Sequence, residues 1–109
     1  MSKDGDAMSI TSILSTEENM LTIGIKGRFD FASHQLFSQA YEDKGDNIAH
    51  YRLDMRDVTY LDSSALGMLL LLKDYCRNNA KISIVNCSDE VKKIFEIANF
   101  QQLFEIKSE

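Results

Sequence analysis

Strand-like and helix-like periodicities alternate along this chain, and the alternation limits the folds open to it. Two alternating apolar runs, at residues 10–14 and 21–25, come first and are joined by a polar turn. Apolar residues then recur at helical spacing over 32–41, 62–79 and from 88 onward, with strand-like runs at 48–55, 81–85 and 103–106. Strands separated by helices need crossover connections, which make neighbouring strands parallel. The pattern predicts a small α/β domain with a mixed β-sheet, an N-terminal strand pair, and alternating helices on one or both of its faces.

The length and net charge of the chain limit the number of domains and the kinds of partner that it can have. A length of 109 residues leaves room for one domain, expected over residues 9–109 after a flexible N-terminal tail at 1–8. Twelve Lys and Arg against 17 Asp and Glu give a net charge of −5, which argues against nucleic-acid binding and against electrostatic attachment to a membrane. No apolar run approaches the roughly 20 residues of a membrane span, and no secretory signal is visible. We therefore expect a cytoplasmic protein.

Residue patterns for common catalytic chemistry are missing. The frame around Ser63 and Ser64 lacks the glycine that precedes a hydrolase nucleophile. The two cysteines and two histidines show no metal-ligand spacing, and the glycines form no phosphate-binding loop. Asp54 follows a strand-like run, as in a phospho-aspartate receiver, but no acidic pair follows the first strand. We predict that the protein is not an enzyme and holds no cofactor and no metal.

Helix starts are marked by capping residues. Asp30 or Ser33 is a candidate N-cap for the first helix, and Ser88 for the last. Asp62 is the candidate N-cap of the helix at 62–79, and it leaves Leu61 and Leu66 at the spacing of a hydrophobic staple. A turn is expected at 43–47 and a loop at 56–61. The last helix should bury one face, which carries Val91, Ile94, Phe95 and Ala98.

The helix at 62–79 carries two leucines in an unusual position. At 100° per residue, one continuous arc of the helix surface is apolar and is predicted to face the hydrophobic core. It consists of Ala65, Met68, Leu69, Leu71, Leu72, Tyr75 and Cys76. Leu66 and Leu70 fall instead in the opposite arc, among Gly67, Lys73 and Asp74. Two interpretations stay open. Either a neighbouring segment covers both leucines, or they form an exposed apolar patch for a partner, beside a glycine that permits close approach.

Ser63 and Ser64 begin the same helix. If Asp62 supplies the cap, their hydroxyls are not needed for capping and remain available. A phosphoryl group would be tolerated there, because a helix N-terminus favours an anion. It would also add about −1.5 to −2 charges beside the leucine patch and could block a docked partner. Capping is nevertheless the commoner role of serines at a helix start.

Three segments carry a resemblance to a known family. The run Leu61-Asp62-Ser63-Ser64-Ala65-Leu66-Gly67, after the strand ending in Leu53-Asp54-Met55, resembles the signature of STAS domains of the anti-sigma factor antagonist type. The strand from Leu21 to Asp30 and the helix from Ser88 to Phe100 are similar to further parts of that domain. The resemblance spans about residues 9–106. Ala65 stands where many members have glycine, and we expect no loss of function from it.

The resemblance implies a phosphorylation-switched binding module. The unphosphorylated protein would sequester an anti-sigma factor that is also a serine kinase. That kinase would phosphorylate Ser64, with Ser63 as second choice, and a serine phosphatase would restore binding. The predicted partner-binding residues are Asp62, Ser63, Ala65, Leu66, Gly67 and Leu70. We expect a monomer or weak dimer. The alternative is a STAS-like scaffold or sensor module that docks onto another signalling enzyme.

Overall fold

The computed structural model describes residues 8–42, 44, 48–77 and 80–109. The tail expected at residues 1–8, apart from Met8, and the turn expected at 43–47, apart from Lys44, lie outside the described residues. The elements are, in chain order, β1 (Ser9–Ser15), β2 (Met20–Phe29), the 3₁₀ turn η1 (Phe31–Ser33), α1 (His34–Glu42), β3 (His50–Leu61), α2 (Ser63–Cys76), β4 (Lys81–Val85), α3 (Asp89–Ile97), the 3₁₀ turn η2 (Phe100–Gln102) and β5 (Glu105–Lys107).

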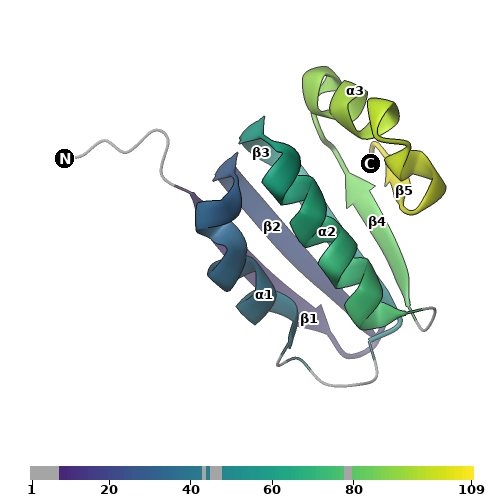
Figure 1. Cartoon of the computed structure of the whole chain (residues 1–109). Helices are drawn as coiled ribbons and strands as arrows, with labels where there is room; N and C mark the ends of the chain where they lie inside the picture. Colours follow the sequence, from purple (N-terminus) through teal and green to yellow (C-terminus); the bar gives the residue numbers. More distant parts are fainter. Residues whose placement is uncertain (1–7, 43, 45–47, 78–79) are drawn as a thin grey trace.

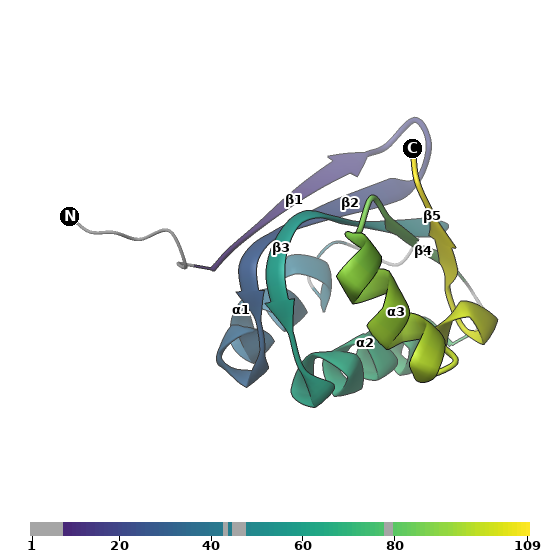
Figure 2. The ribbon, with the colours of Figure 1, turned by 90° about the horizontal axis from the view of Figure 1, so that it is seen from above.

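The strands form one five-stranded sheet in the order β1-β2-β3-β4-β5 (Figure 1). β1 runs antiparallel to β2, and the other neighbours are parallel, as crossovers through helices require. In the described ranges, α1, α2 and α3 all pack on the same face (Figure 2). The mixed α/β fold predicted from the alternating pattern is confirmed.

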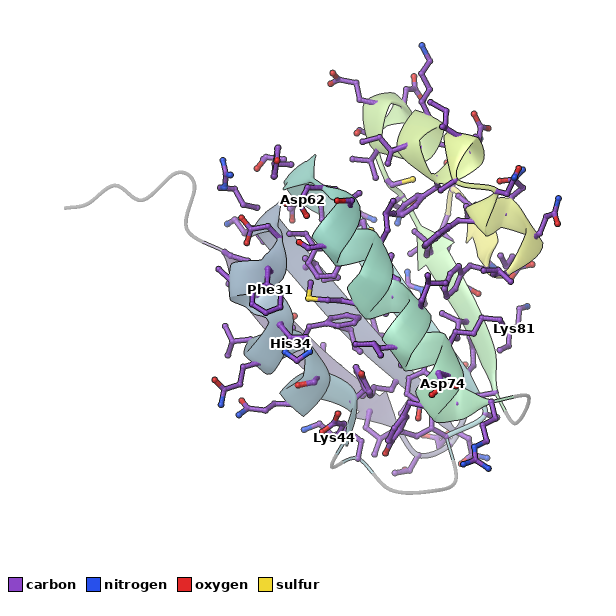
Figure 3. All side chains as sticks on the ribbon, in the orientation of Figure 1. Phe31, His34, Lys44, Asp62, Asp74 and Lys81 are labelled. Atoms are coloured by element: carbon purple, nitrogen blue, oxygen red, sulfur yellow. The ribbon has the colours of Figure 1, made fainter. Side chains whose placement is uncertain are left out.

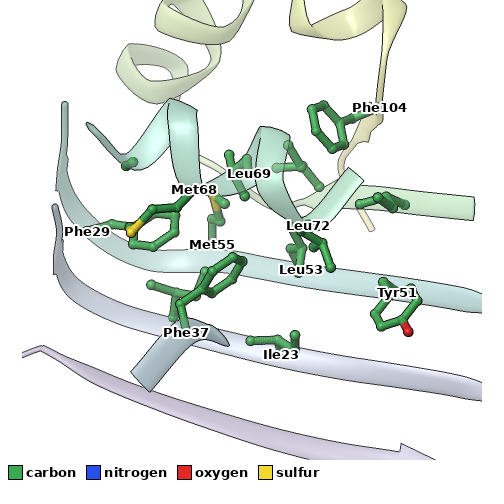
Figure 4. Close-up of a cluster of buried hydrophobic side chains, with 14 of the residues drawn as sticks. Ile23, Phe29, Phe37, Tyr51, Leu53, Met55, Met68, Leu69, Leu72 and Phe104 are labelled. Atoms are coloured by element: carbon green, nitrogen blue, oxygen red, sulfur yellow. The ribbon is translucent and has the colours of Figure 1, made fainter. Parts of the chain in front are cut away.

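The hydrophobic core lies between the sheet and the helices (Figure 4). Leu53 and Met55 of β3 are fully buried under α2, whose Met68 and Leu72 point back at the sheet. Phe29 at the end of β2 meets Phe37 of α1 edge to face, with ring centroids 5.2 Å apart. This packing holds α2 across the middle of the sheet and gives its N-terminus a defined position.

The loop predicted at residues 56–61 is wrong, because β3 continues to Leu61. Its register with β2 shifts twice, once where the pair Gly24–Asp54 is followed by Lys26–Asp57, and again between Gly27 and Arg28. Such irregularities break the two-residue alternation from which a strand is recognised. The extended strand leads directly into Asp62, the N-cap of α2.

Three side chains predicted to be core are exposed. Leu71 and Tyr75 lie on the flank of α2 toward α1, and Ala98 follows the end of α3. Tyr75 packs edge to face on Tyr41 of α1. The predicted arc was too wide because α2 contacts the sheet along a narrower stripe. The helix also ends at Cys76 rather than Asn79, since Arg77 adopts a left-handed φ of 55°; Asn78 and Asn79 lie outside the described residues.

No helix of the described ranges covers the opposite face of the sheet, which we call the open face. A polar network crosses it at Ser83, which is fully buried. The Ser83 hydroxyl donates to Glu105 Oε1 at 3.1 Å and lies 2.7 Å from His50 Nε2. Because the hydroxyl has one proton to give, His50 Nε2 is the donor in the second bond. Lys81 Nζ completes the network, 2.8 Å from Glu105 Oε1.

Candidate functional site

Asp62 organises the N-terminus of α2. Its Oδ1 atom accepts hydrogen bonds from the backbone N–H groups of Ser64 and Ala65, each at 3.1 Å. The predicted N-cap is therefore confirmed. The same oxygen also accepts a 2.6 Å hydrogen bond from the Ser64 hydroxyl. These bonds, the one from the Ser64 hydroxyl first, lower the pKa of Asp62, so its carboxylate stays charged at the head of the helix.

The two serines of the motif occupy different environments. Ser63 is exposed, whereas Ser64 is half-buried and its hydroxyl is held by Asp62. The expectation that both hydroxyls remain unused is therefore wrong for Ser64. A short carboxylate side chain at the N-cap can reach the hydroxyl two residues on as well as the backbone N–H groups. Ser64 consequently has a fixed orientation beside a carboxylate.

The leucines predicted to form a patch behave differently from each other. Leu70 is 42% exposed, as the patch interpretation expects. Leu66 is half-buried and packs against the core, which fits its place opposite Leu61 in a staple. Gly67 is exposed, and a Cβ added to it would meet nothing within 4 Å. Ala65, predicted to contact a partner, is fully buried, so its side chain is not available for such a contact.

Apolar and aromatic residues that the sequence patterns did not assign to a binding surface lie beside α2. Phe31 is 70% exposed and stacks on His34, with ring centroids 5.7 Å apart. Both side chains lie beside α2, below the end marked by Asp62 (Figure 3). Leu71, exposed on the flank of α2 toward α1, adds a further apolar side chain to this region. The signal that could have found Phe31 is the Asp30–Ser33 capping box, which fixes η1 and turns Phe31 outward.

We define the α2 surface as Ser63, Ser64, Gly67, Leu70 and Leu71 of the helix, together with Phe31 and His34. Leucine and phenylalanine side chains form its apolar part, and Asp62 sets a fixed negative charge at one end. This combination suits contact with another protein, because a few exposed apolar anchors carry most of the energy of an interface. A charge added at Ser63 or Ser64 would stand at the edge of those anchors.

Comparison with known proteins places the chain in a family. The model of the STAS domain matches residues 12–109. A STAS-domain containing protein of Pseudomonas aeruginosa is 55% identical over 100 residues, which cover 91% of this chain and 99% of that protein. The chain therefore belongs to the STAS domain family.

More distant relatives have names that describe a function. The anti-sigma-B factor antagonist of Bacillus subtilis is 22% identical over 102 residues, covering 93% of this chain and 94% of that protein. The solved structure of the anti-sigma factor antagonist SpoIIAA in its unphosphorylated form superposes with a TM-score of 0.64 at 14% identity, covering 90% of this chain and 86% of that one. The fold is thus shared with anti-sigma factor antagonists.

Three further properties concern the part of the chain that the structure describes. None of its helices is long and apolar enough to cross a lipid bilayer. No three of its His, Cys, Asp and Glu side chains gather in a way that could hold a metal ion. Cys76 is buried and Cys87 half-buried, and both are free thiols whose pKa burial raises.

Proposed function

We propose that this protein is an anti-sigma factor antagonist whose binding is switched by phosphorylation of Ser64. In the unphosphorylated form, the α2 surface binds an anti-sigma factor that is also a serine kinase, and so releases a sigma factor. The observation that carries the proposal is the Asp62–Ser64 pair at the head of a helix whose outer face carries exposed apolar side chains. The relatives named as anti-sigma factor antagonists support the choice of partner.

Ser64 is favoured over Ser63 by its orientation. The hydrogen bond to Asp62 presents the Ser64 oxygen in one direction and leaves an Oγ lone pair that can attack the γ-phosphorus of a nucleotide. In that step the Oγ–P bond forms, the bond between the γ-phosphorus and the leaving nucleoside diphosphate breaks, and the hydroxyl proton passes to the Asp62 carboxylate, to which it is already hydrogen-bonded. Ser63 is exposed and lacks this orientation, so it remains the second choice.

Electrostatics give the switch its direction. The N–H groups of Ser64 and Ala65, which could bind a phosphate, are already bonded to the Asp62 carboxylate. A phosphoryl group on Ser64 would add about −1.5 to −2 charges beside that carboxylate. It would therefore break the Asp62–Ser64 bond and turn toward the partner, weakening the complex. A serine phosphatase would hydrolyse the ester and restore the binding form.

The test is capture followed by phosphorylation. Wild-type protein and the Ser64→Ala and Ser64→Asp variants are immobilised and exposed to lysate of the source cells. We expect wild type and Ser64→Ala to retain a protein with an anti-sigma factor kinase sequence, and Ser64→Asp to retain at least tenfold less of it. With ATP, the purified captured protein should phosphorylate wild type at Ser64, as located by mass spectrometry.

The controls separate the proposal from its alternatives. The matched variant Ser63→Asp adds the same charge one residue away, and a loss of binding there but not in Ser64→Asp would reassign the switch to Ser63. Retention of a different signalling enzyme, with no phosphate transferred to either serine, would instead identify a scaffold or sensor module. Wild-type binding by Ser64→Asp together with no binding by Ser64→Ala would overturn the proposal.

A further inference from the structure

The two edges of the sheet differ in how they are protected against pairing. β5 has three residues, and two of them, Glu105 and Lys107, are charged. β1 at the other edge has seven residues, Ser9–Ser15, with no charge and no proline among them. An edge strand presents unpaired N–H and C=O groups, and proteins normally blunt such edges with charges, proline or short strands. β1 carries none of these devices.

Apolar side chains at the β1 edge are left exposed. Ile13 is 68% exposed on the open face, and Leu14 is also exposed, on the face that bears the helices. Leu36 of α1 is exposed as well. It lies about 140° around the helix from Tyr41, whose ring meets Tyr75 of α2, so Leu36 is on the flank of α1 away from α2. That flank overlies the β1 side of the sheet (Figure 1).

We propose that β1 pairs antiparallel with β1 of a second copy of this chain, about a twofold axis that is perpendicular to the sheet and passes midway between Ser12 and its copy. The two sheets then form one continuous sheet with both helical layers on the same side. The same edge of two copies related by such an axis always runs antiparallel, and each copy offers the same surface. This inference does not rest on the proposed function, since the α2 surface is not part of the edge.

The β1 sequence is self-complementary in this register. An axis at Ser12 puts Ser12 opposite its own copy, Thr11 opposite Ile13, and Ile10 opposite Leu14. Ile10 and Leu14 pair with the buried Ile25 and Leu21 of β2, so both belong to the helix-bearing face. Across the new contact, Ile10 of each copy therefore lies opposite Leu14 of the other, and the twofold axis repeats this apolar pair. Both pairs lie on the face of the sheet that holds the core.

Other registers are less favourable. Pairing has to keep every side chain on its own face, so the register can shift only in steps that preserve this alternation. The neighbouring allowed registers centre on Thr11 or on Ile13, and they put Ile10 or Leu14 opposite Ser12. No register of Ser9–Ser15 brings two charges together, which matters for two copies that each carry a net charge of −5.

Sedimentation of the full chain tests the dimer. We expect the mass of wild type to rise from 12.4 kDa toward twice that value as concentration increases into the millimolar range. Ile13→Lys places a charge on the edge at a side chain that the fold leaves exposed, and it should raise the dissociation constant about tenfold or more. Ile97→Lys makes the same change at an 84% exposed position of α3 and should leave the dissociation constant unchanged.

Cross-linking tests the register. Opposite residues of antiparallel strands have Cα atoms about 4.5 or 5.5 Å apart, within the range of a disulfide. Under mild oxidation, Ser12→Cys should therefore give a covalent dimer. Thr11→Cys is the matched control, because its two copies would lie about 8 Å apart and out of reach. Wild type treated in the same way measures any contribution of Cys76 and Cys87.

Three outcomes would overturn the proposal. One is a wild-type chain whose mass stays at 12.4 kDa over the whole concentration range. In that case β1 would pair with a strand of another protein or with no strand. Another is a dimer that Ile13→Lys does not weaken, which would place the contact elsewhere. The third is cross-linking of Thr11→Cys that equals or exceeds that of Ser12→Cys, which would exclude the twofold axis at Ser12.

Discussion

The hydroxyl of Ser64 donates a 2.6 Å hydrogen bond to the same Asp62 oxygen that caps helix α2. Capping and the candidate modification site are therefore coupled through one atom. Phosphorylation of the Ser64 oxygen would remove a donor from Asp62 and bring negative charge against its carboxylate. The coupling makes the start of α2 sensitive to modification while the core contacts of α2, further along the helix, stay in place.

Replacing Asp62 with Ala should destabilise the fold by about 1 kcal/mol, because the N–H groups of Ser64 and Ala65 lose their acceptor. The measurement is the free energy of unfolding in urea. Asp74→Ala, on the exposed face of the same helix, is the matched control and should change the free energy little. Equal effects of the two variants would contradict the capping role of Asp62.

Replacing Leu70 with Gln should leave the melting temperature close to that of wild type and weaken binding at the α2 surface. The reason is that Leu70 is exposed, so a polar side chain there stays in water. Leu72→Gln makes the same change two residues later at a fully buried position, and should cost about 3 kcal/mol or more of stability. Thermal unfolding of both variants checks this, and a large drop for Leu70→Gln would show that it belongs to the core.

Replacing Gly67 with Ala should stabilise the free protein by about 0.5–1 kcal/mol, since alanine is the better helix former and a Cβ at this position meets nothing. If a partner approaches α2 closely at Gly67, the same change should weaken binding. Urea unfolding and the capture assay together measure the two effects. A variant that is more stable and binds as wild type does would remove Gly67 from the α2 surface.

Acidification should destabilise the fold in two stages, because two groups of the polar network on the open face, His50 and Glu105, have lowered pKa values in the folded protein. Burial, with Lys81 and Lys107 nearby, lowers the pKa of His50 below the ordinary 6.5, so the unfolded chain takes up a proton first and stability falls as the pH drops below 6.5. Hydrogen bonds from Lys81 and Ser83 lower the pKa of Glu105 from 4.5 to about 2, so stability falls again between those values.

The pH dependence is checked by urea unfolding at a series of pH values. His50→Gln keeps an N–H donor for Ser83 and cannot titrate, so its curve should lack the first fall while matching wild type near pH 8. His34→Gln removes the other histidine, which stacks on Phe31 away from the network, and is the control. Retention of the first fall in His50→Gln would assign it to another group.

Local patterns were sufficient for the main elements of the fold. The caps at Asp62 and Ser88 and the strand at residues 81–85 were predicted from residues that act within a few positions of one another. The alternation of strands and helices was sufficient to predict the parallel part of the sheet, because two neighbouring strands joined by a helical crossover run in the same direction. These features depend on nearest neighbours along the chain.

Tertiary structure decided what depends on contacts between distant segments. Leu71 and Leu72 are adjacent leucines, yet only the packing of α2 on the sheet makes one exposed and the other buried. The second half of β3 is a strand because β2 pairs with it through two register shifts, which no pattern of residues 56–61 reveals. Phe31 lies beside α2 because η1, α1 and α2 pack on one face of the sheet. The serine motif and its N-cap Asp62 could be predicted from the sequence, because they involve residues close together in the chain. The α2 surface could not, because it forms only where η1, α1 and α2 pack against one another.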